Sequence, residues 1–142
     1  MRRLLAVALA FVAPSALAQR LPLNPAVTQD NIAETICLPG WTRTVRPPVS
    51  YTNAIKRERL LAAGLPLDLM ADFQLDHTVP LSLGGAPDDP QNLALMDRDE
   101  AEAKDRIERC LPHAVCDGRV PLEAAQQAIW RDWRAAATFC AR

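Results

Sequence analysis

The centre of the chain carries the sequence LDHTVPLSLGG at residues 75–85, followed closely by DPQNL at residues 89–93. Apolar side chains alternate with polar ones over residues 73–83, as they do in a half-buried β-strand. Two glycines come next, and glycine pairs favour the tight turns that join strands. We therefore predict a strand or hairpin arm over this segment, with a turn at Gly84-Gly85.

An acid–histidine pair, Asp76 and His77, lies inside this apolar pattern. A histidine with a near-neutral pKa is able to take a proton from water, and carboxylate oxygens suit Mg²⁺, Mn²⁺ or Zn²⁺. Neighbouring residues on a strand point to opposite faces, so both side chains reach one site only at a strand end or a bulge. Asn92 ends the following loop and is placed to return an amide to the imidazole. The residues by themselves leave a catalytic and a purely structural role open.

The rest of the sequence predicts short extended pieces and helices joined by polar turns. The first helix ends at Gly64, and glycine is common just after a helix. In the last helix apolar residues recur every three or four positions, which is typical of a face that packs into a core. His113 lies between two cysteines and is expected in a surface loop. The extended pieces are predicted over residues 35–38 and 41–45, and the helices over residues 53–63, 98–111 and 121–139.

Length and composition place the chain among single-domain globular proteins. It has 142 residues, of which 49% are hydrophobic and 23% charged, so wholesale disorder is excluded. Arg2 and Arg3 precede an apolar stretch, and Ala16-Leu17-Ala18 has the small-x-small form of a cleavage site. Residues 1–18 are therefore predicted to be a secretory signal peptide, followed by one domain over residues 19–142. No apolar run reaches the roughly 18 residues that a membrane span needs, so no transmembrane segment is expected in the mature chain.

All four cysteines lie in the part of the chain that we expect to be exported. An even number of cysteines in an oxidising compartment indicates disulfide bonds, and we expect a periplasmic or secreted protein. Four cysteines allow three pairings, and spacing alone does not choose among them. A zinc site is the competing interpretation, but the chain has no Cys-x-x-Cys pair. The cysteines are Cys37, Cys110, Cys116 and Cys140.

Charge is unevenly distributed along the chain. Without residues 1–18, 14 basic and 17 acidic side chains remain, and a net charge of −3 does not favour nucleic-acid binding. Residues 41–60 nevertheless hold five basic residues and one acidic residue, whereas residues 88–108 hold eight acidic and three basic residues. The basic segment is predicted either to bind a phosphate backbone or to form an exposed basic face. Its cations are Arg43, Arg46, Lys56, Arg57 and Arg59.

The central residues resemble the HNH endonucleases, in which a β-hairpin and a following helix surround one divalent metal ion, the ββα-metal fold. The resemblance rests on the acid–histidine pair, the apolar strand, the Gly-Gly turn, the Asp-Pro-x-Asn-Leu step and the helix that follows. It extends over most of residues 28–136 to a group of small exported bacterial HNH-type proteins. It implies a small α+β domain with a hairpin–helix core over about residues 73–109 and flanking helices held by disulfides. Further similar segments are Gly40-Trp41, Pro47-Pro48, Lys104-Asp105 and Glu108.

The resemblance also implies roles for individual residues. His77 corresponds to the general base that deprotonates the attacking water, and Asp76 corresponds to a metal ligand. Asn92 corresponds to the middle residue of the motif, whose hydrogen bond orients the histidine. The implied cofactor is one divalent ion, Mg²⁺, Mn²⁺ or Zn²⁺, which stabilises charge on the phosphate and on the leaving 3′ oxygen. The implied disulfides are Cys37–Cys116 and Cys110–Cys140.

The sequence departs from the family at the third position of the motif. Many HNH endonucleases have a histidine early in the helix as a further protein ligand, but the corresponding position here is Ala101. Glu100 and Asp105 are therefore predicted as replacement ligands, since carboxylates also bind divalent ions. Lys104 is predicted to contact phosphate. The simpler interpretation is that the acidic residues form a solvated helix face.

Three functions follow from these alternatives. The first is a metal-dependent phosphodiesterase that cleaves DNA or RNA outside the cytoplasm. The second is a catalytically inactive scaffold of the same fold that binds nucleic acid or a protein partner. The third is a structural protein in which the acid–histidine pair is merely packed, and it predicts that His77 and Asn92 do not meet.

Overall fold

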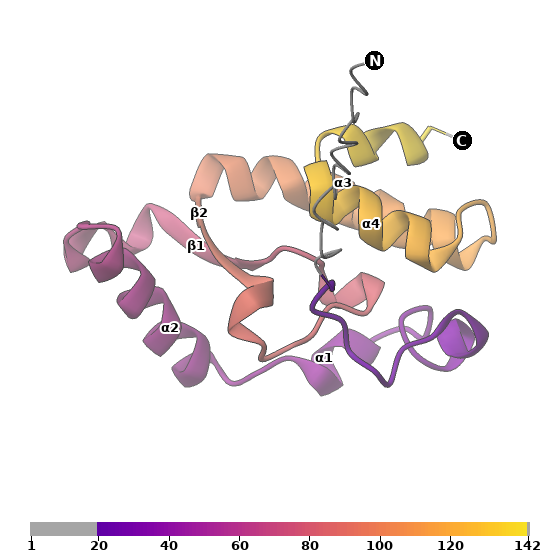
Figure 1. Ribbon diagram of the computed structural model, residues 1–142, viewed down its shortest axis with the longest axis horizontal. Helices are drawn as coiled ribbons and strands as arrows, with labels where there is room; N and C mark the ends of the chain where they lie inside the picture. The colour runs from indigo at the N-terminus through magenta and orange to yellow at the C-terminus, as the bar shows by residue number, and fades with distance from the viewer. Residues whose placement is uncertain (1–19, 142) are drawn as a thin grey trace, which may run out of the picture.

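The structure is a computed structural model that describes residues 20–141 (Figure 1). The predicted signal peptide, residues 1–18, lies outside the described residues. Helices and one small antiparallel sheet make up the described chain, which confirms the α+β class. The helices are α1 (Trp41–Val45), α2 (Val49–Ala62), α3 (Arg98–Cys116) and α4 (Leu122–Asp132), the strands are β1 (Phe73–His77) and β2 (Leu93–Asp97), and short 3₁₀ turns span Gln29–Glu34, Leu67–Ala71, Leu81–Leu83, Pro90–Asn92 and Ala135–Phe139.

The two strands form a hairpin that leads directly into a helix. β1 and β2 pair in antiparallel fashion, with Phe73 opposite Asp97 and His77 opposite Leu93. α3 begins at the residue after β2, where the Asp97 carboxylate accepts a hydrogen bond from the Asp99 amide (2.9 Å). A carboxylate at this position stabilises a helix because it satisfies one of the unpaired N–H groups of the first turn. β1 and α3 are in contact, so residues at the end of β1 reach side chains of α3.

The first strand is shorter than the sequence predicts, since it ends at His77 and not at Leu83. Pro80 has no N–H group to donate to a ladder of hydrogen bonds, and residues Leu81–Leu83 form a single 3₁₀ turn. The apolar alternation continues past the strand because Val79 and Leu83 are fully buried in the same core. Alternation of apolar and polar residues therefore does not reveal where the strand ends and the turn begins in this segment.

The two extended pieces predicted before the first helix are wrong. Residues 35–38 form a turn, and residues 41–45 form the single-turn helix α1. The hydroxyl of Thr44 donates to the backbone oxygen of Trp41 (2.7 Å), and such local bonds compete with extended pairing. Threonine and arginine alternation therefore indicated a strand where the backbone is helical.

The predicted central helices are present with wider bounds, as α2 and α3. α3 runs through Pro112 to Cys116, so His113 is exposed on a helix and the predicted loop is wrong. The last predicted helix breaks after Asp132, whose carboxylate accepts from the Arg134 amide (2.9 Å) and so replaces a helical hydrogen bond. Within residues 20–141, no helix has the length and apolar composition needed to cross a membrane.

The main core lies between α3, α4 and the 3₁₀ turn after β1, and two disulfides join the flanking segments to it. Cys37–Cys116 attaches the segment before α1 to the end of α3, with Cα atoms 5.7 Å apart. Cys110–Cys140 attaches the C-terminal segment to the same helix, with Cα atoms 5.5 Å apart. The pairing that the resemblance implied is therefore confirmed. α2 lies away from α4 and packs against β1 (Figure 1).

Candidate functional site

His77 is the last residue of β1, and its imidazole is held by the loop between the strands. The side chain is buried, and its Nε2 atom lies 2.9 Å from the backbone oxygen of Pro87. A carbonyl oxygen only accepts hydrogen bonds, so this contact assigns the proton to Nε2. Nδ1 then carries the lone pair, which is the form of the ring that accepts a proton.

The surroundings of His77 favour its neutral form. Burial is the largest influence and lowers its pKa below the ordinary value of 6.5, and the nearby cations of Arg46 and Lys104 lower it further. The Pro87 carbonyl and the Asp76 carboxylate act in the opposite direction without reversing the shift. A buried imidazole that is neutral near pH 7 has the protonation state required of a general base.

Asn92 makes its side-chain hydrogen bonds to the loop backbone and not to the imidazole, which corrects the contact expected from the sequence. Its Oδ1 accepts from the Val79 amide (2.8 Å), and its Nδ2 donates to the oxygens of Val79 (2.9 Å) and Ala86 (2.8 Å). Both amide hydrogens are therefore used. Because Ala86 precedes Pro87, Asn92 fixes the loop that in turn holds His77.

The second glycine of the turn permits this close packing. A Cβ atom on Gly85 would lie 1.8 Å from the Val79 oxygen and 2.7 Å from Nδ2 of Asn92, so any larger residue would push the loop apart. Gly84 has a backbone φ of 74°, a conformation that residues other than glycine rarely adopt. Gly85 and Asn92 thus pack tightly against one another in the loop that holds the histidine.

Lys104 of α3 is buried beneath the acid–histidine pair. Its Nζ donates to Oδ2 of Asp76 (2.7 Å), to the backbone oxygen of His77 (2.8 Å) and to Oε1 of Glu108. The side chain is 1% exposed and all three of its N–H groups are engaged, which leaves none for the predicted phosphate contact in this arrangement. Lys104 instead ties α3 to the end of β1.

The charges in this cluster depend on one another. Burial alone would lower the pKa of Lys104, but attraction to Glu108 and Asp76 outweighs it and the pKa is raised. Burial raises the pKa of Glu108 to about 7, although Lys104 opposes the shift. Lys104 is therefore a permanent cation at neutral pH, and Glu108 changes its charge near pH 7.

Three carboxylates and the histidine line one small cavity of about 160 Å³, to which β1 contributes Asp76 and α3 contributes Asp105 and Glu108. Of the two replacement ligands predicted on the helix, only Asp105 is found here. Glu100 lies elsewhere and pairs with Arg134 (2.6 Å). Glu108 was not predicted as a site residue, although its spacing of four from Lys104 and three from Asp105 places all three near one helix face.

The cavity does not form a closed metal cage. Among the described residues, no three histidine, cysteine or acidic side chains converge closely enough to hold a metal ion. Mg²⁺ and Mn²⁺ are commonly held by one or two carboxylates together with water and substrate phosphate. Lys104 engages only Oδ2 of Asp76, and Asp105 lines the same cavity, so these two carboxylates are the ligands that the chain offers.

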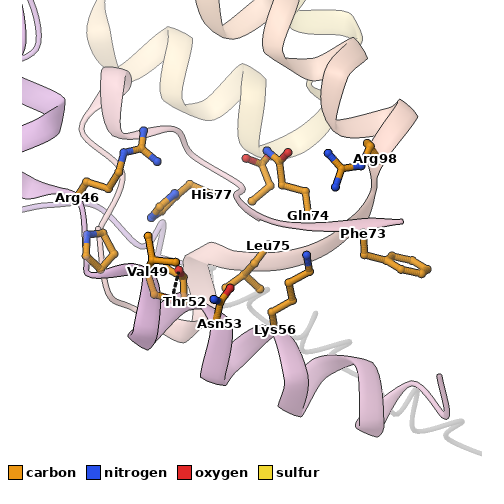
Figure 2. Close-up of a pocket in the computed structure, with 12 residues that line it drawn as sticks. Arg46, Val49, Thr52, Asn53, Lys56, Phe73, Gln74, Leu75, His77 and Arg98 are labelled. Atoms are coloured by element: carbon orange, nitrogen blue, oxygen red, sulfur yellow. Dashed lines mark hydrogen bonds between the residues drawn. The ribbon is translucent and has the colours of Figure 1, made fainter. Parts of the chain in front are cut away.

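A second cleft, of about 260 Å³, lies between α2 and β1 and also contains Asp76 and His77 (Figure 2). Two of the five cations predicted to bind nucleic acid, Arg46 and Lys56, line it. Arg98, which the charge pattern did not single out, lines it as well. The segment 41–60 contributes to this cleft only in part, because sequence proximity does not determine which side chains face β1.

The other three predicted cations lie outside the cleft. Arg59 donates to the Pro90 oxygen (2.8 Å), and the guanidinium of Arg43 lies against Gly40. Arg57 is exposed on α2 and lines neither cavity.

No protein-family model, no curated protein and no solved structure matches this chain. The site must therefore be interpreted from its own geometry and from the resemblance of its central residues.

Proposed function

We propose that the protein is a metal-dependent phosphodiesterase of the HNH type that hydrolyses nucleic acid. The observation that carries this proposal is the fixed, buried imidazole of His77 at the edge of a cavity shared with Asp76 and Asp105. A neutral base beside hard oxygen donors is a combination that supports metal-assisted hydrolysis of a phosphodiester.

In the proposed reaction His77 acts on water. Nδ1 takes a proton from a water molecule as the water oxygen attacks phosphorus. The bond from phosphorus to the 3′ oxygen breaks, which leaves a 5′ phosphate, and the 3′ oxygen takes a proton from solvent water. Arg46 lines both cavities and is placed to contact the phosphate, whose charge grows in the transition state. Asp76 and Asp105 would hold Mg²⁺, Mn²⁺ or Zn²⁺, which supplies electrostatic stabilisation of the phosphate and the leaving oxygen when bound.

We further propose that this activity is located outside the cytoplasm, in the periplasm or the medium. Two disulfides within residues 20–141 fit an oxidising compartment. The signal peptide expected over residues 1–18 gives the same location.

A second candidate function is a binding scaffold without catalysis. It is favoured by Lys104, whose ammonium already pairs with Asp76 and Glu108 and offsets part of their negative charge without a divalent ion. In that case nucleic acid or a protein would bind near the site and remain intact.

Cleavage assays on the mature protein separate the two functions. Supercoiled plasmid, single-stranded DNA and RNA would be incubated with Mg²⁺, Mn²⁺, Zn²⁺ or EDTA, and the variant His77→Ala would be compared with His113→Ala, which removes an exposed histidine. Cleavage that needs a metal and is lost only in His77→Ala supports the enzyme. Cleavage that persists in EDTA and in His77→Ala contradicts it, and intact substrate under every condition supports the scaffold.

A further inference from the structure

We propose that the cleft between α2 and β1 binds a single-stranded segment of nucleic acid and leads its backbone past His77. This inference rests on the proposed action on nucleic acid and specifies the form of the substrate. It assigns the strand to one side of the sheet, along β1 and against α2.

The cleft carries an excess of positive charge from three separate elements. Arg46 follows α1, Lys56 lies on α2 and Arg98 begins α3. Figure 2 shows Arg46 and Arg98 toward opposite ends of the group, with Lys56 extending from α2 toward β1. Asp76 is the one acidic residue of the lining, and its Oδ2 is already bound by Lys104. Such a lining attracts a chain of phosphates.

Two of these cations, Lys56 and Arg98, line the same part of the chain's surface and repel one another. Burial and then repulsion by Arg98 lower the pKa of Lys56. Arg98 itself is fixed, because its guanidinium donates to the Ala71 oxygen through Nε (2.8 Å) and Nη2. A bound anion would relieve the repulsion between Lys56 and Arg98, so this pair has the character of a phosphate site.

The lining of the cleft favours a single strand. Its volume of about 260 Å³ accommodates a phosphate with its sugar. Phe73 lines the same cleft, and aromatic rings in single-strand sites stack on bases. Asn53 and Gln74 add side-chain amides that are able to donate to phosphate or base oxygens.

The cleft is continuous with the proposed reaction site. Three residues line both the cleft and the cavity of about 160 Å³ that contains the carboxylates: Arg46, Asp76 and His77. A strand bound along β1 would therefore place a phosphate between Arg46 and His77. The cations of the cleft and the proposed base would then contact successive parts of one backbone.

The test is direct binding, measured in EDTA so that cleavage does not interfere. Fluorescence anisotropy of a short labelled oligo(dT) would be recorded with the mature protein, and unlabelled duplex of the same length would compete. The variant Lys56→Met would be compared with Arg57→Met, which removes a charge from the neighbouring, exposed position of α2. Arg46→Gln, at an exposed residue between helices, is the second cleft variant, and circular dichroism checks that each variant is folded.

We expect Lys56→Met and Arg46→Gln each to weaken binding about tenfold, the value of one charge-assisted hydrogen bond. Each should also lower the slope of log affinity against log salt concentration by the amount expected for about one phosphate contact. Arg57→Met should change affinity by less than about twofold. Equal losses in Lys56→Met and Arg57→Met, no binding of oligo(dT), or tighter binding of the duplex would overturn the inference. Specific binding without cleavage under any metal condition would retain the cleft and reject the nuclease. Cleavage combined with equal losses in the two α2 variants would reject only the cleft.

Discussion

The ammonium group of Lys104 lies 2.7 Å from Oδ2 of Asp76, at a position where the lysine side chain is 1% exposed. The same ammonium donates to the backbone oxygen of His77 (2.8 Å). One residue of α3 thus holds both members of the acid–histidine pair, through a side chain in one case and through the backbone in the other. The position of the proposed base therefore depends on contacts with α3, which begins at Arg98.

Replacing Lys104 with methionine should destabilise the fold strongly. The change leaves Asp76 and Glu108 without their buried counter-ion, and breaking a buried pair from one side costs about 3–5 kcal/mol. Urea denaturation would measure the free energy of unfolding. Arg106→Met is the matched control, since Arg106 is exposed on the same helix and its loss should cost no more than about 0.5 kcal/mol. Equal effects in the two variants would show that the buried contacts of Lys104 are energetically unimportant.

Glu108 should make stability depend on pH near neutrality. Its pKa is raised from 4.5 to about 7, so the folded state prefers the protonated form. The resulting stabilisation is complete below pH 4.5 and is lost as pH rises through 7. Urea denaturation across this range should therefore show the wild type losing stability relative to Glu108→Gln, which does not titrate. A constant difference between the two proteins would contradict the raised pKa.

Asn92→Ala should lower the free energy of unfolding by about 3 kcal/mol. The substitution leaves three buried backbone groups, the amide and oxygen of Val79 and the oxygen of Ala86, without partners. Each unsatisfied buried group costs about 1–3 kcal/mol, and relaxation of the loop offsets part of the sum. Gln91→Ala, at the exposed neighbouring position, is the control and should change the free energy of unfolding by less than about 0.5 kcal/mol. A small effect of Asn92→Ala would mean that water replaces the amide.

Local patterns in the sequence were sufficient for much of this site. The acid–histidine pair, the two glycines and the asparagine are recognisable from the sequence alone, because turn residues and polar residues inside an apolar run are visible over a few positions. The helices α2 and α3 and the start of β1 follow from period and composition in the same way, whereas the strands are joined by residues 78–92 and not by a tight turn at Gly84-Gly85. The disulfide pairing did not come from spacing and needed the resemblance.

Long-range pairing was the part that the sequence did not reveal. Lys104 lies four residues before Glu108 on a helix, and the sequence alone suggests an ordinary solvated pair. Its burial becomes visible only in the structure, where its ammonium also contacts Asp76, 28 positions earlier. Arg98 was counted within an acidic segment, yet it joins Arg46 and Lys56 in the cleft. In each case the partner comes from another element, and a count of charges along the chain contains no information about which elements pack together.

The two disulfides should contribute unequally to stability. Cys37–Cys116 spans 79 residues and Cys110–Cys140 spans 30, and the cost of closing a loop in the unfolded chain grows with its length. We expect about 4 kcal/mol from the first bond and about 1 kcal/mol less from the second. Urea denaturation of the double variants Cys37→Ala/Cys116→Ala and Cys110→Ala/Cys140→Ala would measure the difference. Greater destabilisation from the shorter loop would show that interactions in the folded state outweigh the unfolded-state effect.

His77 should titrate below its ordinary value of 6.5, because burial is the largest influence on its pKa. The sign for stability follows from this shift: the contribution of the neutral ring is complete above pH 6.5 and is lost as pH falls through the lowered pKa. Cleavage should therefore rise with pH below 6.5 as Nδ1 loses its proton.

NMR titration of the imidazole in EDTA would give the pKa of His77, with His113→Ala used to assign the two histidine signals. Arg46→Gln should raise the pKa of His77, since it removes a cation that lowers it, whereas Arg57→Gln should not. A titration midpoint above 6.5, or equal midpoints in the two arginine variants, would contradict the described environment of the ring.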